Sequence, residues 1–92
     1  MNSDLAMFES KIKLALEVVR AIGTSDEAAS GATRALLAET ESRAGNPEAA
    51  PYSGMLPFIR KADSDVESKN LIAAAKRLQD ALDILANYET GV

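Results

Sequence analysis

The sequence predicts a small all-α protein, an antiparallel bundle of three to four helices in a single domain over residues 1–92. Two observations support this prediction. Apolar residues recur at the three- and four-residue spacing of amphipathic helices, and residues that commonly begin or end helices separate the apolar stretches. All three prolines fall between residues 47 and 57, which predicts a loop over residues 45–57. Helices are expected at about 4–22, 25–44, 56–63 and 65–89.

The first expected helix carries apolar residues on more than one side. An inner stripe consists of Leu5, Phe8, Ile12, Ala15, Leu16 and Val19, and an outer stripe of Met7, Leu14, Val18 and Ala21. Together they span roughly 200°, about twice the arc that a one-sided surface helix needs. Ser3 suits the N-cap of this helix, and Gly23 suits the residue after its end. We therefore expect cover on two sides, from this chain or from another.

The second expected helix has a weak apolar face. Thr24 and Glu27 fit a capping box at its start, and Gly45 suits its end. Its apolar side is mostly alanine, with Ala28, Ala29, Ala32 and Ala35 joined by Leu36. Small side chains allow a neighbouring helix to come close, but each of them buries little area.

Two apolar stripes in the last third of the chain predict a break between two helices. One contains Phe58, Ile59, Ala62 and Val66, and the other Leu71, Ala74, Ala75, Leu78, Leu82 and Leu85. They are rotated by roughly 140° on a single helix, and Ser64 and Glu67 between them fit a second capping box. One continuous helix with two partners is the alternative. Since the first and last helices are both rich in apolar residues, we expect them to pair and to repeat that pairing across a two-fold axis.

The expected loop is unusually apolar. It contains Tyr52, Met55 and Leu56, with Phe58 directly after it. Either the loop folds over the open end of the bundle, or these residues form a docking segment for a partner.

The composition points away from catalysis. The chain contains no cysteine and no histidine, which excludes disulfides, the usual zinc sites and Ser–His or Cys–His nucleophile pairs. The acidic run 63–67 resembles the start of a calcium loop, but Ser68 and Ala74 replace the glycine and glutamate that the loop requires. We expect no catalytic residue, no cofactor and no metal site.

The net charge of −4 also restricts the partners. Nucleic-acid and anionic-membrane binding both depend on Lys and Arg, so we expect neither. The acidic N-terminus has no continuous apolar core of the kind that a signal peptide needs, and no run approaches the length of a membrane span. We expect a cytoplasmic protein, and signal-independent secretion is left open.

These patterns predict a homodimeric helical interaction module, such as an adaptor, chaperone-like protein or scaffold. The outer stripe is the first expected contact surface, and Tyr52, Met55, Leu56 and Phe58 are the second. One alternative is an acidic inhibitor or regulator of a nucleic-acid-binding protein, which would present Glu39, Glu41 and Glu48. Another is a DNA-associated regulator with a degenerate helix-turn-helix around residues 19–25.

Overall fold

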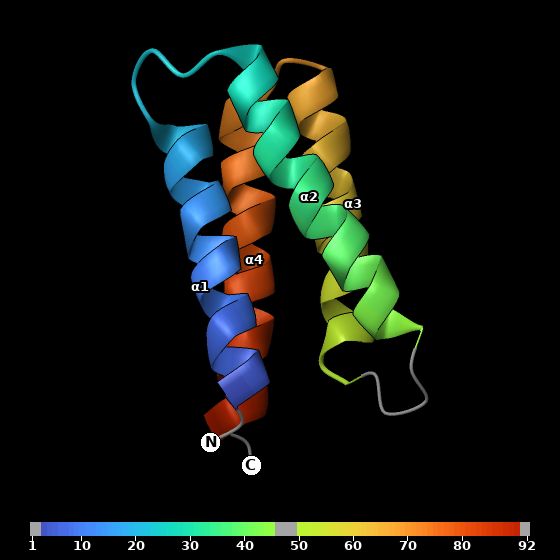
Figure 1. Cartoon of the computed structure of the whole chain (residues 1–92). Helices are drawn as coiled ribbons and strands as arrows, with labels where there is room; N and C mark the ends of the chain where they lie inside the picture. The colour runs from blue at the N-terminus through green and yellow to red at the C-terminus, as the bar shows by residue number, and fades with distance from the viewer. Residues whose placement is uncertain (1–2, 46–49, 91–92) are drawn as a thin grey trace.

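The chain forms a four-helix bundle in the computed structural model, which describes residues 3–45 and 50–90. The helices are α1 (Ser3–Arg20), α2 (Asp26–Ala44), α3 (Tyr52–Glu67) and α4 (Leu71–Thr90). They run alternately up and down, so that neighbours in the sequence are antiparallel (Figure 1). No strand occurs in this part of the chain. The predicted all-α bundle is confirmed.

The four helices are arranged in a ring. The backbone of α1 lies against those of α2 and α4, and the backbone of α3 also lies against those of α2 and α4 (Figure 1). The described helices make no close backbone contact across the diagonals. The resulting body measures 38 × 22 × 18 Å.

The core comes mainly from three of the helices. Its largest fully buried apolar side chains are Phe8 and Ile12 of α1, Met55 and Ile59 of α3, and Leu78 and Leu85 of α4. Helix α2 contributes Leu36 and the smaller Ala29, Thr33 and Thr40. Its weak apolar face therefore packs beside the core and adds little volume to it.

Side-chain caps define the turn between α1 and α2. Gly23 adopts a φ of +81°, a conformation that side chains with a Cβ rarely take. The Thr24 hydroxyl donates to the Val18 carbonyl at 2.8 Å and closes the end of α1. Ser25 is the N-cap of α2, because its hydroxyl accepts from the Ala28 backbone N–H at 3.0 Å. The predicted capping box with Thr24 as N-cap is therefore wrong by one residue.

Helix α3 begins earlier than the sequence predicts. It starts at Tyr52, where a loop was expected, and continues through Pro57. Pro57, the sixth residue of α3, has no N–H to donate to the Ser53 carbonyl. Ser53 is exposed, so water can satisfy that carbonyl. Residues 46–49 of the expected loop lie outside the described part of the chain.

The turn between α3 and α4 confirms two helices but moves the break. Lys69 has a φ of +62°, and the N–H groups of Lys69 and Asn70 donate to the carbonyls of Val66 and Asp65 at 2.9 and 2.8 Å. These two bonds form a Schellman motif that ends α3. The Asn70 side chain then caps α4 by accepting from the Ala73 N–H at 3.1 Å. The predicted N-cap at Ser64 is wrong, because α3 continues to Glu67.

Candidate interaction surface

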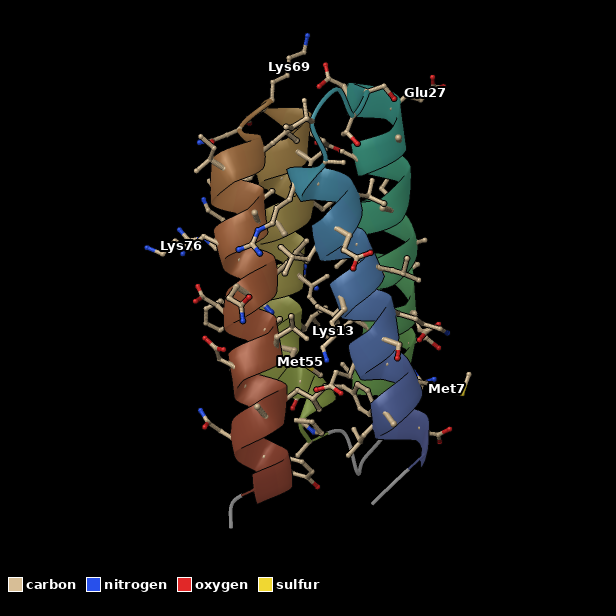
Figure 2. The ribbon with its side chains drawn as sticks, turned by 90° about the vertical axis from the view of Figure 1, so that its left-hand side faces the viewer. Met7, Lys13, Glu27, Met55, Lys69 and Lys76 are labelled. Carbon is tan, nitrogen blue, oxygen red and sulfur yellow. The ribbon has the colours of Figure 1, made fainter. Side chains whose placement is uncertain are left out.

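The outer stripe of α1 lies on the surface of the bundle. Leu14 is 60% exposed and Met7 57% exposed, while Ala21 is exposed and Val18 half-buried. Met7 points away from the bundle, whereas Met55 points into it (Figure 2). The inner stripe fills the core, with Phe8 and Ile12 fully buried. The neighbouring helices therefore cover only the inner stripe of α1.

A groove runs between α1 and α2, next to the outer stripe. Leu14 and Val18 contribute to its α1 side, Ala32, Ala35 and Leu36 form its α2 side, and its volume is about 350 Å³. We call this feature the α1–α2 groove. It exists because the alanines of α2 are too small to fill the space between the two helices. Met7 and Ala21, the other members of the outer stripe, do not line it.

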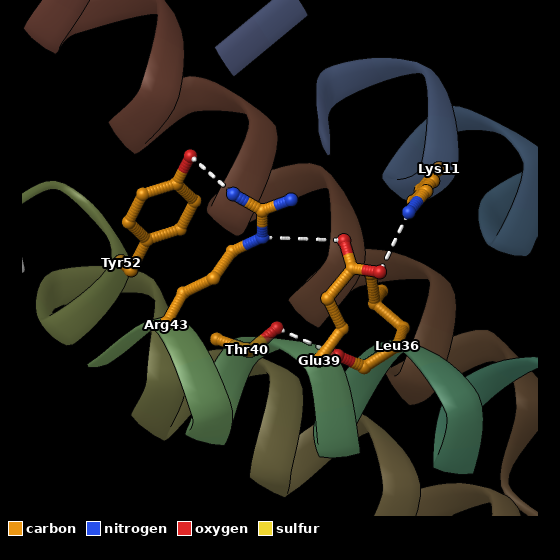
Figure 3. A network of polar contacts seen from close by, with 6 residues as sticks. All are labelled: Lys11, Leu36, Glu39, Thr40, Arg43 and Tyr52. Carbon is orange, nitrogen blue, oxygen red and sulfur yellow. Dashed lines mark hydrogen bonds and ion pairs between the residues drawn. The ribbon is translucent and has the colours of Figure 1, made fainter. Parts of the chain in front are cut away.

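A polar network joins α1, α2 and α3 and reaches the groove through Lys11 and Glu39 (Figure 3). The Lys11 ammonium lies 2.6 Å from Glu39 Oε1, and Arg43 Nε lies 3.4 Å from Glu39 Oε2. The hydrogen bond from Lys11 lowers the pKa of Glu39, helped by the charges of Lys11 and Arg43 and opposed by partial burial. Glu39 is therefore held in its charged form, and the network ties α1 to α2.

Arg43 connects this network to the aromatic residues of the core. Its guanidinium lies 5.6 Å from the centre of the Phe8 ring and 5.3 Å from that of Tyr52, within the range of cation–π contacts. It also donates to the Tyr52 hydroxyl at 3.3 Å. The two rings meet edge to face at 5.0 Å. These contacts hold the Arg43 guanidinium in place, so its role is structural.

The residues of the second expected contact surface are mostly buried or half-buried within the bundle. Tyr52 and Met55 are buried, and Leu56 and Phe58 are half-buried, all within α3. Both expected alternatives assumed a loop, whereas these residues belong to a helix that packs into the core. Little of Tyr52 or Met55 is left for a partner.

Most acids of the expected charge surface are engaged in ion pairs. Glu39 pairs with Lys11 and Arg43, and Glu41 pairs with Arg60 at 3.3 Å. Glu48 lies outside the described residues. The turn of the expected helix-turn-helix joins two antiparallel helices, and Asp26 and Glu27 open the second of them (Figure 1). Neither charge-based binding of a partner nor DNA binding gains support from this arrangement.

Sequence reasoning missed a second surface, between α1 and α4, which faces the viewer in Figure 2. An upper hollow of about 460 Å³ is lined by Arg20, Ile72 and Lys76 among others. A lower hollow of about 420 Å³ includes Leu16, Glu17, Leu82, Asp83 and Ala86. We call the surface formed by the two hollows the α1–α4 face. One feature of the sequence could have indicated this surface, because Ile72 is apolar but lies next to the polar side of α4.

Comparison of the chain with protein-family models, curated proteins and solved structures gives no match. Within residues 3–45 and 50–90, no group of three or more acidic side chains is placed to hold a metal ion. None of the described helices has the length and hydropathy needed to cross a membrane.

Proposed function

We propose that this chain is a non-enzymatic interaction module, an adaptor or scaffold that binds a helix of a partner protein in the α1–α2 groove. The main observation in support is the exposure of Leu14 beside a groove lined by small and apolar side chains. Apolar grooves between helices commonly receive the apolar face of an amphipathic helix.

The lining of the groove suits the close approach of a partner helix. Alanines at 32 and 35 allow the backbone of a partner helix to approach α2 closely. Leu14 would contribute contact area, at roughly 1.5–3 kcal/mol for a large apolar side chain that becomes fully buried. Lys11 and Glu39 provide a polar rim of the kind that surrounds apolar contacts in interfaces.

A photo-crosslinking amino acid at position 14 tests this proposal in the cells that make the protein. We expect one dominant adduct, which disappears when Ala35→Glu places a charge in the groove. The matched control carries the same crosslinker at Lys61, which is exposed on α3. Equal labelling from positions 14 and 61, or an adduct that survives Ala35→Glu, would contradict the proposal.

A further inference from the structure

The α1–α4 face is one continuous furrow. Its upper and lower hollows share Arg20 and Gln79. On α4 the furrow extends from Leu71 to Ala86, which corresponds to about 22 Å at a rise of 1.5 Å per residue. A furrow of this length can accommodate a helix of another molecule.

The two halves of the furrow carry opposite uncompensated charges. Lys76 lines the upper hollow, Glu17 and Asp83 line the lower hollow, and Arg20 lines both where they meet. None of these four side chains forms an ion pair within the described residues, whereas Lys11, Arg34, Arg43, Arg60, Lys69 and Arg77 all do. The remaining charges of the furrow are compensated, since Glu9 pairs with Lys13 and Asp80 with Arg77.

On each of the two helices the cation stands nearer the upper end of the bundle and the acid nearer the lower end (Figure 1). Lys76 and Asp83 stand at equal distances from the midpoint between Gln79 and Asp80, and Glu17 and Arg20 stand on either side of Val18 and Val19. Gln79 and Arg20 mark the point where the two hollows meet. A two-fold axis that crosses α4 between Gln79 and Asp80 and α1 between Val18 and Val19 would exchange Lys76 with Asp83 and Arg20 with Glu17.

The apolar surface follows the same division. Ile72 is 87% exposed at the upper hollow. Ile22, which follows the end of α1, is also fully exposed. The lower hollow instead offers a partly apolar lining from Leu16, Leu82 and Ala86. Both halves therefore offer an apolar recess, and the upper half also carries the protruding Ile72 side chain.

We propose that a second copy of this chain covers the α1–α4 face, with α4 antiparallel to α4 of the partner subunit. This places Lys76 opposite Asp83 of the partner subunit and Arg20 opposite Glu17 of the partner subunit. Ile72 then covers the lower hollow of the other copy. Lys76 is exposed and extends sideways from α4 (Figure 2).

The size of the bundle is sufficient for such an interface. A side of a body 38 Å long and 18 to 22 Å wide is close in area to the roughly 800 Å² per partner that a standard stable interface buries. The proposal leaves the α1–α2 groove free, so it adds self-association to the proposed function and assigns it a separate surface.

Charge reversal tests the proposal with the protein alone. One variant carries Arg20→Glu and Lys76→Glu, and the other carries Glu17→Arg and Asp83→Lys. We expect the unchanged protein to have twice the 9.7 kDa chain mass in sedimentation over a dilution series. Each variant alone should dimerise at least about tenfold more weakly, because two-fold symmetry repeats every unfavourable pair. An equimolar mixture of the two should regain the dimer mass.

Two controls separate this result from other causes. Lys61→Glu reverses an exposed charge outside the furrow and should leave the dimer unchanged. Circular dichroism checks that every variant is folded. A monomeric unchanged protein, or a dimer that resists charge reversal but is lost on Leu14→Glu, would overturn the proposal. Crosslinking from position 14 tests the α1–α2 groove, and sedimentation tests the α1–α4 face. Failure of one proposal can therefore be distinguished from failure of the other.

Discussion

The ammonium of Lys11 lies 2.6 Å from the carboxylate of Glu39, and this ion pair joins α1 to α2 beside the α1–α2 groove. Both side chains keep partial access to water. A pair of this kind typically contributes about 0.5–1 kcal/mol to stability. Its main structural effect is to fix how far apart the two helices stand.

The lowered pKa of Glu39 predicts how this contribution depends on pH. An acid whose pKa is lower in the folded protein stabilises the fold above its unfolded pKa and loses that effect as the pH falls through its folded value. Glu39→Gln should therefore cost stability at pH 7, and the cost should shrink below the ordinary pKa of 4.5. Urea unfolding between pH 7 and pH 3 measures this difference. Glu27→Gln, at an exposed residue without an ion pair, is the control.

Replacing Lys69 with glycine should stabilise the protein. Lys69 adopts a φ of +62°, and the left-handed region costs a residue with a Cβ about 1 kcal/mol relative to glycine. Its ion pair with Asp26 is 3.8 Å long and exposed, so its loss should cost little. We expect Lys69→Gly to raise the free energy of unfolding by about 0.5–1 kcal/mol. Lys61→Gly, inside α3, should lower it by a similar amount, and the same sign for both changes would contradict the argument.

The two buried threonines of α2 should respond differently to valine. The Thr33 hydroxyl lies 3.0 Å from Asp63 Oδ1, so Thr33→Val removes a partner from a half-buried carboxylate. The Thr40 hydroxyl donates at 2.7 Å to the Leu36 carbonyl, four residues earlier in the same helix. We expect Thr33→Val to cost about 1–2 kcal/mol and Thr40→Val to be close to neutral. Thermal unfolding of both variants under one condition measures the contrast.

Leu78 and Leu14 should respond differently to alanine, because Leu78 lies in the core and Leu14 on the surface. Leu78 is fully buried, and Leu78→Ala should cost about 2–5 kcal/mol because it leaves a cavity. Leu14 is 60% exposed, so Leu14→Ala should change the stability of the isolated chain by about 0.5 kcal/mol or less. Urea denaturation at low protein concentration makes the comparison without a contribution from self-association. A large loss at Leu14 would mean that this side chain supports the fold.

Much of the fold could be predicted from apolar spacing. The inner stripe of α1 and the leucines of α4 repeat with helical period, and both lie in the core. The rotation between the stripes of α3 and α4 correctly indicated two helices. The boundaries were harder, because Pro57 suggests a loop although it is tolerated inside α3. Lys69 is an unusual residue for the left-handed conformation that ends α3. Asn70 before Leu71 is a recognisable N-cap for α4, but the capping-box pattern at Ser64 led to a different prediction.

The surfaces were only partly predictable. The outer stripe follows from the wheel of α1 alone, but its exposure depends on which helices stand beside it. The α1–α4 face combines residues more than fifty positions apart in sequence, such as Arg20 and Lys76. Ion pairs between helices decide which charges stay uncompensated, and single-sequence patterns do not contain that information.

The ring of helices has a consequence for the order of the chain. The first turn of α1 and the last turn of α4 lie at the same end of the bundle (Figure 1), and α1 and α4 already pack side by side. A short linker between them would close the chain into a circle without moving any helix. The circle could then be opened in the turn at Lys69, which would give a circular permutant that starts with α4 and keeps every helix neighbour.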